Sequence, residues 1–293
     1  MRVYLETDME GVAGVLNFHE WTEPGQPYYE QAKEFLTLEI NAAIDGFLEG
    51  GATYILVHDG HGFGGINVAL LDPRVEYVRG SPDKGYPGNL DSSFDYIAWV
   101  GQHAKAGTPY GHLAHTQWID HLDETINDIS IGEFGETAGC ASELGVRAIF
   151  GSGDVAFTRE AQELISGIET VAVKEGVKSG TGEDLDEEAY SRYVGSARHL
   201  HPERARRLIR AGALRAMGRA RTEDFGIAPF KPPYRRVIKL RPGRGRPKPT
   251  MAVMEHATSF IGVMNIRSEF KPIGEHAATA KKTKRAETKR AKT

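Results

Sequence analysis

The chain has 293 residues, of which 40% are hydrophobic and 26% are charged, a composition that is ordinary for a globular protein. Its hydrophobic runs fall well short of the roughly 20 residues that a membrane-spanning helix needs, which argues against an integral membrane protein. Residues 231–293 contain 17 Lys and Arg against 4 Asp and Glu, so residues 1–230 contain 19 against 36, and this acidic remainder argues against a nucleic-acid-binding globular domain.

The first part of the chain predicts strands that alternate with a long helix. Residues 2–6 have strand character, and Pro27 opens a helix whose hydrophobic residues recur at helical spacing as far as Leu48. A strand at residues 54–58 follows, so this strand, helix and strand predict a right-handed βαβ unit with parallel strands. We expect next a short helix at 66–71 and strands at 75–78 and 96–100.

The second part of the chain continues this alternation after one interruption. Residues 124–131 read as a β-hairpin with Asn127-Asp128 at its turn. The expected elements after it are a helix from Gly132 to Leu144, a strand at 147–151, a helix at 158–165, a strand at 170–173, a loop at 176–189 and an amphipathic helix at 202–219. We therefore predict an α/β fold, with a mostly parallel sheet flanked by helices and a small hairpin insertion.

The composition divides the chain into three parts. Residues 1–225 are expected to form the α/β domain. Residues 226–273 are a basic segment rich in Pro and Gly, in which one further element is possible after Met251. Residues 274–293 are rich in Ala, Lys and Thr without hydrophobic periodicity, so we expect this basic tail to be disordered.

Three of the predicted strands end in residues that commonly bind metal ions. Asp8 and Glu10 follow the first strand, His61 follows the second, and His103 follows the strand at 96–100. Because the carboxyl ends of parallel strands meet at one edge of a sheet, we expect these four side chains to gather there. Two carboxylates placed two residues apart in an extended segment also point the same way, and they repel each other unless a cation or a proton lies between them.

Glu133, close to the expected start of a helix, adds a fifth candidate ligand. Asp59, two residues before His61, is expected to orient the His61 ring without binding the metal itself. Each of the five has an ordinary explanation by itself, as a surface charge, a loop histidine or a buried core histidine, but their combination favours a metal site. Carboxylate and imidazole ligands without thiolate suit zinc or another divalent ion of that group. Five ligands exceed one tetrahedral site, so two ions that share a carboxylate are the natural interpretation.

Five short motifs resemble the zinc D-aminopeptidases of the bacterial dipeptide-transport operon. They are Asp8-Met9-Glu10-Gly11, Asp59-Gly60-His61, Gly101-Gln102-His103-Ala104, Thr108-Pro109 followed by His115, and Gly132-Glu133. Their order and approximate spacing agree with the family across about residues 1–175, which makes the resemblance specific.

The resemblance implies two zinc ions in each subunit, held by Asp8 as the bridge, by Glu10 and His61 in one site, and by His103 and Glu133 in the other. It also implies that His115, rather than the nearby His112, is the catalytic residue beside the ions. Members of the family have an α/β fold and assemble as rings whose active sites face an inner chamber. They release N-terminal residues from short peptides, with D-amino acids as the founding specificity.

Other interpretations stay open. An amidase or a phosphoesterase could use the same dinuclear site, although Lys105 is the only basic residue within a few positions of a candidate ligand. A non-enzymatic peptide-binding or nucleic-acid-binding protein with a structural metal is a further alternative. Gly245-Arg246-Pro247 resembles the AT-hook, a segment that binds the minor groove of DNA, but one such tripeptide is common by chance.

Cys140 is the only cysteine, so there is no intrachain disulfide and a reducing compartment fits. The N-terminus lacks the pattern of a signal peptide, and we therefore expect a cytoplasmic protein. The residues alone leave open the stereospecificity, the peptide length, the physiological metal and the size of the oligomer.

Overall fold

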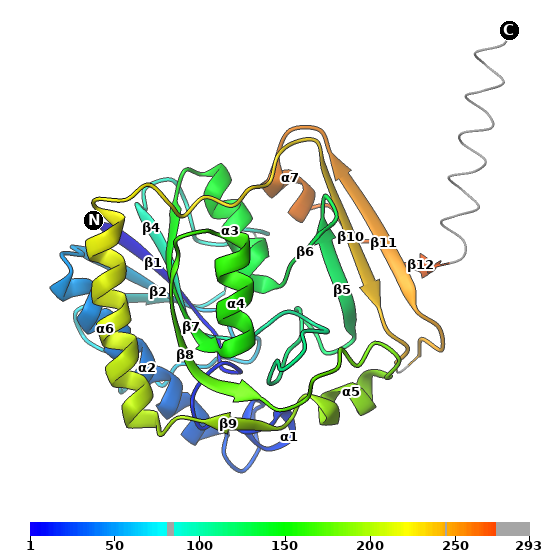
Figure 1. Ribbon diagram of the computed structural model, residues 1–293, viewed down its shortest axis with the longest axis horizontal. Coiled ribbons are helices and arrows are strands. Elements are labelled where there is room, and N and C mark those ends of the chain that lie inside the picture. The colour runs from blue at the N-terminus through cyan, green and yellow to red at the C-terminus, as the bar shows by residue number, and fades with distance from the viewer. Residues whose placement is uncertain (81–84, 244, 274–293) are drawn as a thin grey trace, which may run out of the picture.

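The first strand shows how this sequence builds a sheet that is buried on both sides. In β1 (Arg2–Thr7), Val3 and Leu5 pack in one hydrophobic core, whereas Tyr4, between them, packs in another. A strand with both faces buried belongs in the middle of a parallel sheet that helices cover on both sides. The computed structural model, which describes residues 1–80, 85–243 and 245–273, shows this arrangement (Figure 1).

The larger sheet contains seven strands within the described residues, in the order β3-β2-β1-β4-β7-β8-β9. Besides β1, they are β2 (Tyr54–Asp59), β3 (Glu76–Val78), β4 (Tyr96–Gln102), β7 (Arg147–Asp154), β8 (Glu169–Gly176) and β9 (Ala197–His199). Neighbouring strands are parallel from β3 to β8, and only the edge strand β9 runs antiparallel. The predicted mostly parallel α/β fold is thus confirmed, and the carboxyl ends of β1, β2 and β4 meet at one edge.

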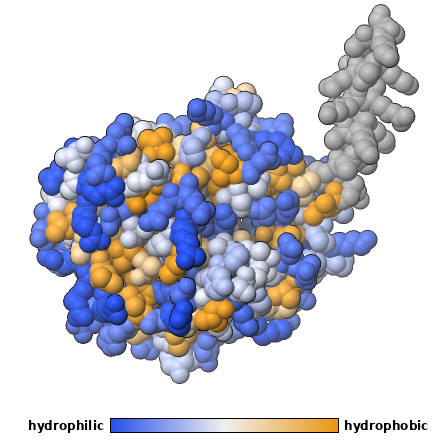
Figure 2. All heavy atoms as spheres, viewed as in Figure 1, coloured by the Kyte–Doolittle hydropathy of each residue, from blue (hydrophilic) through white to orange (hydrophobic). Residues whose placement is uncertain are grey.

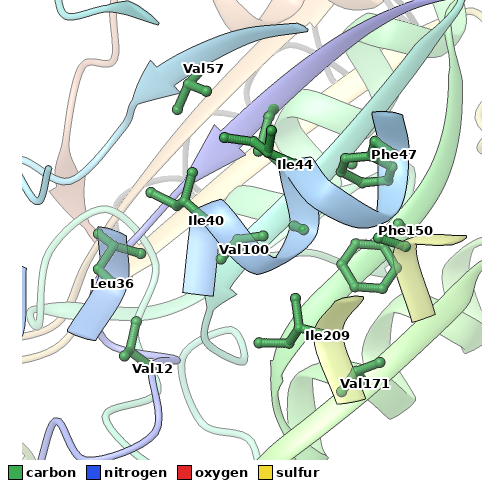
Figure 3. Packing of buried hydrophobic residues seen from close by; sticks show 14 of the residues in the cluster. Val12, Leu36, Ile40, Ile44, Phe47, Val57, Val100, Phe150, Val171 and Ile209 are labelled. Atoms are coloured by element: carbon green, nitrogen blue, oxygen red, sulfur yellow. The ribbon is translucent and has the colours of Figure 1, made fainter. Parts of the chain in front are cut away.

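Two pairs of helices cover the two faces of this sheet (Figure 1). One face carries α2 (Tyr29–Glu49) and α6 (Pro202–Ala220), and the other carries α3 (Glu133–Glu143) and α4 (Val155–Leu164). Figure 3 shows the core beneath the first pair, where Phe47 of α2 packs edge-on against Phe150 of β7, with Ile209 of α6 close by. The short helices α1 (Phe18–Trp21) and α5 (Glu187–Tyr193) lie outside these pairs.

The second sheet is antiparallel and contains five strands within the described residues, in the order β12-β11-β10-β5-β6. They are β5 (His121–Ile126), β6 (Ile129–Ser130), β10 (Tyr234–Leu240), β11 (Thr250–His256) and β12 (Lys271–Pro272), with α7 (Phe260–Met264) packed against β10 and β11. The hairpin of β5 and β6 agrees with the prediction. The sequence did not indicate β10, because Pro232-Pro233 precede it and its Arg and Lys residues interrupt the hydrophobic pattern.

Two local expectations differ from the structure. The short helix expected at residues 66–71 is wrong: these residues form turns, and the backbone N–H of Asn67 is held by Thr37 Oγ1 of α2. The loop expected at 176–189 ends early, because the Asp186 side chain accepts from Ala189 N and so caps the start of α5. The tail at 274–293 lies outside the described residues, so its disorder stays a prediction.

In the described part of the chain, no helix is both long enough and apolar enough to cross a membrane. On the face of the molecule shown in Figure 2, hydrophobic residues form separate areas between hydrophilic ones. Trp118 is the most exposed large hydrophobic side chain among the described residues, at 62%.

The close packing of α2 against α6 predicts that Gly46 cannot be enlarged. A Cβ atom at Gly46 would lie 2.3 Å from the backbone oxygen of Arg210, so Gly46→Ala must push the helices apart. We expect it to lower the free energy of unfolding by about 1–3 kcal/mol, measured by urea denaturation. Gly218→Ala, in α6, is the matched control, because a Cβ atom there meets nothing within 4 Å and the better helix propensity of Ala should stabilise the protein. Equal effects of the two substitutions would contradict this packing.

Candidate metal centre

The five predicted metal ligands come together at the edge of the larger sheet. Asp8 follows β1, His61 lies two residues after β2, and His103 follows β4, so the parallel strands deliver them to one place. Glu10 lies in the loop after Asp8, and Glu133 is the first residue of α3. Asp8, Glu10, His61 and His103 are buried, and Glu133 is partly buried.

Glycines in the motifs allow the ends of β1 and β4 to approach each other. Gly11 N donates to Gly101 O over 2.7 Å, and a Cβ atom at Gly11 would lie 2.1 Å from Gln102 O. Gly101 has a φ of 76°, in the left-handed region that favours glycine, and a Cβ atom there would lie 2.0 Å from Asp8 O. These contacts fix the backbone of Asp8 beside that of His103.

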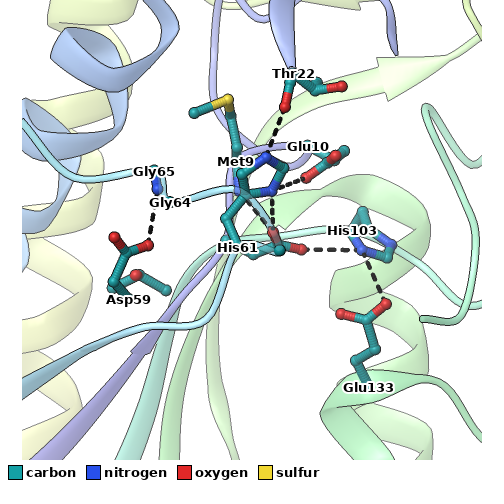
Figure 4. A network of polar contacts seen from close by, with 12 residues as sticks. Met9, Glu10, Thr22, Asp59, His61, Gly64, Gly65, His103 and Glu133 are labelled. Carbon is teal, nitrogen blue, oxygen red and sulfur yellow. Dashed lines mark hydrogen bonds and ion pairs between the residues drawn. The ribbon is translucent and has the colours of Figure 1, made fainter. Parts of the chain in front are cut away.

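Asp8 lies between the two histidines, with one oxygen directed at each. Figure 4 shows Glu10 beside His61 and Glu133 beside His103. Its Oδ1 is 3.2 Å from His61 Nδ1, and its Oδ2 is 2.9 Å from His103 Nε2. Glu10 Oε2 is 3.2 Å from His61 Nδ1, and Glu133 Oε1 is 3.6 Å from His103 Nε2. The cluster therefore has two halves that share Asp8.

The second nitrogen of each histidine contacts a backbone carbonyl. His61 Nε2 lies 2.7 Å from Thr22 O, and His103 Nδ1 lies 3.0 Å from Ala104 O. In the neutral ring that nitrogen carries the proton, so the nitrogen facing the carboxylates is free to bind a metal ion. This use of carbonyl partners is typical of metal-binding histidines.

Two buried carboxylate oxygens of the cluster lack hydrogen bonds with the described residues, and a bound cation would provide the missing partner. Asp8 Oδ2 and Glu10 Oε2 lie within 3.2 Å of histidine nitrogens, but the angles at these contacts are not those of hydrogen bonds with any described residue. Buried carboxylate oxygens without such bonds carry a large desolvation cost. A divalent ion bound by the same oxygens and nitrogens would offset this cost.

The charges in the metal-free protein depend on one another. Burial alone would lower the pKa of His61 and of His103, but the carboxylates of Glu10 and Asp8 around the first ring, and of Glu133 and Asp8 around the second, raise both pKa values well above the usual range. Burial alone would raise the pKa of Asp8, yet His103 and His61 hold it well below its usual range. Without a metal ion, the protonated rings of His61 and His103 therefore provide the positive charge that balances the carboxylates.

His115 lies beside the half of the cluster that contains His103 and Glu133. Its ring stacks on that of His103 with the centroids 3.9 Å apart, and its Nε2 is 3.8 Å from Glu133 Oε1. His115 Nδ1 lies 2.8 Å from Leu113 O, so the neutral ring presents an unprotonated Nε2 to the cluster. Burial, together with the charge of His103, lowers the pKa of His115.

His112 has different surroundings. It is completely buried, its Nε2 lies 3.0 Å from Leu16 O, and its backbone N–H donates to Asp154 Oδ2 over 2.8 Å. Its ring meets that of His199 edge-on. His112 therefore packs inside the protein with Leu16, Asp154 and His199 and has a structural role.

A set of buried and partly buried polar side chains that the sequence did not indicate supports the loop after β1. Lys174 Nζ donates to Glu10 O and to Val15 O, and Glu39 Oε1 accepts from Ala13 N over 3.0 Å. His199 Nδ1 accepts from Gly14 N over 3.1 Å. Burial lowers the pKa of Lys174 to about 8 and raises that of Glu39 to about 8. Lys174, which directly follows the apolar residues 171–173 of β8, was the available signal for this network.

Asp59 does not contact His61, although the sequence suggested that it orients this ring. Its Oδ1 accepts from Gly65 N over 2.8 Å, and its Oδ2 lies 3.4 Å from Arg79 Nη1. Asp59 therefore shapes the loop that carries His61 rather than the ring itself.

A cavity of about 890 Å³ opens beside the cluster. Its walls come from the cluster, α1, Trp118, the start of α5 and the turn near Gly243. Acidic residues outnumber basic ones there, with Glu23, Glu187 and Glu188 among them, and the guanidinium of Arg246 pairs with Asp120 over 2.7 Å. This engagement also leaves Arg246 unsuited to insertion into a DNA groove.

Comparison with known proteins reveals similarity over most of the chain. A model of the peptidase M55 family, described as D-aminopeptidase, matches residues 1–244. A D-aminopeptidase of Bacillus subtilis (strain 168) is 28% identical over 243 residues, which are 82% of this chain and 81% of that protein. Among solved structures, the fold is similar to that of the "Zn-dependent D-aminopeptidase DppA from Bacillus subtilis, a self-compartmentalizing protease", with a TM-score of 0.76 and 23% identity, covering 90% of this chain and 94% of that one.

The raised pKa values of His61 and His103 predict that the metal-free protein releases protons when a divalent ion binds near neutral pH. Both rings are protonated there, and a ligand nitrogen must lose its proton. Calorimetric titrations in buffers of different ionisation enthalpy should count about two protons per chain, falling as the pH rises through the folded pKa values. Metal binding without proton release would show that the two histidines are not the ligands.

Proposed function

The chain belongs to the M55 peptidase family of D-aminopeptidases, and we propose that it is a zinc enzyme with two ions that releases N-terminal residues from short peptides. The position of Asp8 between His61 and His103 is the observation that carries the proposal. A carboxylate whose two oxygens face two separate ligand groups is the bridge that a dinuclear site requires.

Each ion would have its own ligands besides Asp8. Glu10 and His61 would complete one site, and His103 and Glu133 the other, in agreement with the two halves of the cluster. Bound zinc supplies a Lewis acid that activates water at neutral pH and polarises a carbonyl group.

His115 would move the proton in this reaction. The unprotonated Nε2 of the neutral ring can accept a proton from the attacking water and return it to the leaving amine. Burial lowers the pKa of His115, which favours the neutral form of the ring. Leu113 O fixes the tautomer that this role needs.

The charge of the larger cavity favours a peptide over a phosphate ester. Its wall contains Glu23, Asp186, Glu187 and Glu188, and Arg246 is paired with Asp120. An acidic wall attracts the protonated amino terminus of a peptide and repels a phosphate group. The acidic wall would suit a cationic amide equally well, so an amidase is the alternative function.

The proposal includes a homo-oligomer in a reducing, cytoplasmic environment. The structurally similar zinc enzyme is described as self-compartmentalizing, and a ring of subunits around an inner chamber is one form of such a protease. The single cysteine, Cys140, is buried, so the fold does not depend on a disulfide.

The proposed activity is tested by incubating the metal-loaded protein with D-Ala-D-Ala, L-Ala-L-Ala, an amide and a phosphoester, each with and without a chelator. We expect chelator-sensitive hydrolysis of the unblocked dipeptides, and faster hydrolysis of the D-form. Hydrolysis of the phosphoester alone, or hydrolysis that the chelator leaves unchanged, would overturn the proposal.

Asp8→Ala should remove both ions, because its carboxylate serves each half of the cluster. Elemental analysis should find about two zinc ions per chain in the wild-type protein and almost none in this variant. Asp45→Ala is the matched control, since Asp45 is a half-exposed helix residue that pairs with Arg74 on the surface. Full metal content in Asp8→Ala would mean that the bridge is elsewhere.

His115→Ala should retain zinc and lower kcat and kcat/KM together, by about 10²–10⁴, because it removes a group that acts in the transition state. His112→Ala should instead lower the melting temperature and affect the rate much less, because it removes a buried ring that contacts Leu16 O and packs against His199. Loss of zinc from His115→Ala would make His115 a ligand. Normal peptide hydrolysis by His115→Ala, with an inactive His112→Ala, would reverse the two roles.

A further inference from the structure

A second cavity, of about 300 Å³, also borders the candidate metal centre. Asp8, Gly60, Gln117 and Glu133 line both this smaller cavity and the larger one. The remaining walls of the smaller cavity include Glu6, His58 and Gln102 at the strand ends, Thr137 of α3 and the segment from Gly85 to Gly88. The proposed ligands therefore stand where two cavities of unequal size meet.

Most polar groups in the smaller cavity already have partners. His58 Nδ1 pairs with Glu6 over 2.8 Å, Tyr86 donates to Glu136 over 2.6 Å, and Gln117 Nε2 donates to Glu136 over 2.7 Å. The hydroxyl of Thr7 donates to His58 O, and that of Thr137 donates to Glu133 O. These groups form the wall and are not free for a ligand.

Apart from Asp8, whose unbonded Oδ2 faces His103 in the metal centre, the side-chain amide of Gln102 is the exception among the described residues that line this cavity. Gln102 is the last residue of β4 and only 3% exposed, yet its Nε2 makes no hydrogen bond with any described residue. A buried donor without a partner is unfavourable, and in native proteins it calls for a bound group that completes it. Gln102 therefore indicates a ligand that offers an oxygen acceptor.

We propose that the smaller cavity is the subsite for the side chain of the peptide's N-terminal residue, and that the Gln102 amide selects uncharged side chains with a hydrogen-bond acceptor. This inference rests on the aminopeptidase function proposed above. The smaller cavity has about a third of the volume of the larger one, so it suits one side chain, whereas the larger cavity can take the rest of the peptide.

The charges of the smaller cavity limit what it accepts. No Lys or Arg is among its described lining residues, and His58, its one basic group besides the metal centre, is neutralised by Glu6. A carboxylate side chain would find no free cation, and a cationic one would leave the Gln102 amide unpaired. An uncharged acceptor, such as the side chain of Asn or Thr, meets both conditions.

The test compares dipeptides whose first residues have similar shape but differ in the acceptor. One series places D-Asn or D-Leu first, with D-Ala second, and the reverse series places D-Ala first, with D-Asn or D-Leu second. In the wild-type protein we expect kcat/KM to be about tenfold higher with D-Asn than with D-Leu at the first position, which is the difference that one hydrogen bond would give. Gln102→Met, which keeps the length and removes the amide, should bring that ratio to about one and change the reverse series by less than about twofold.

Glu188→Gln, at the wall of the larger cavity, is the matched control. It should leave the ratio of D-Asn to D-Leu at the first position unchanged, because Glu188 does not line the smaller cavity. An unchanged first-position ratio in Gln102→Met, or a change confined to the second position, would overturn the subsite. If the wild-type protein hydrolyses no dipeptide in a chelator-sensitive way, the proposed function itself fails and the subsite falls with it.

A second variant covers the case in which Gln102→Met fails to fold or to retain metal, as judged by its melting curve and elemental analysis. Thr137→Ser keeps the hydroxyl that bonds Glu133 O and Trp99 Nε1 but removes a methyl group from the cavity wall. It should raise kcat/KM for D-Leu relative to D-Ala at the first position and leave the second position unchanged. Calorimetric binding of free D-Asn and D-Leu provides a readout without turnover: the wild-type protein should bind D-Asn more tightly, and equal affinities would contradict the subsite.

Discussion

The burial of Asp8 between His61 and His103 is the constraint on which the rest of the site depends. A carboxylate is tolerated in such a place only when its oxygens have charged or hydrogen-bonding partners at short distance. Here the partners come from the loops directly after β2 and β4, the two strands that flank β1 in the sheet. The glycines at positions 11 and 101 let the ends of β1 and β4 approach closely, which places Asp8 beside His103.

The surroundings of the cluster keep this geometry from relaxing. On one side, Lys174 and Glu39 hold the loop that carries Glu10 by its backbone. On the other side, Gln117 N donates to Glu133 Oε1 over 2.6 Å, while its side chain bonds Glu136. Glu136 in turn pairs with Arg236 of β10 over 3.0 Å, so the second sheet supports the first through a continuous chain of contacts.

The sequence predicted the elements whose signals are local. Apolar runs that end in glycine and a metal-type ligand indicated β1, β2 and β4, and their parallel arrangement explains why Asp8, His61 and His103 could be expected together. The sequence did not predict contacts between residues that lie far apart in the chain. From the sequence, Arg236 resembles a surface charge in a basic segment, but in the structure it is buried and paired with Glu124 and Glu136. Lys174 likewise resembles an exposed residue, but it is buried and donates to Glu10 O in the loop after β1. The role of Asp59 was missed for the same reason, because its partner is the backbone of Gly65 and not the neighbouring histidine.

The close grouping of Asp8, Glu10 and Glu133 has a consequence for the abundance of the protein in a cell. A ligand that binds only the folded state adds to its stability in proportion to the logarithm of the free ligand concentration. With the proposed ions as that ligand, the folded fraction of the chain would follow the supply of metal, and chains made during scarcity would unfold more often and meet proteases sooner. The carboxylates proposed to bind the ions would then also make the amount of folded enzyme depend on how much metal the cell takes up.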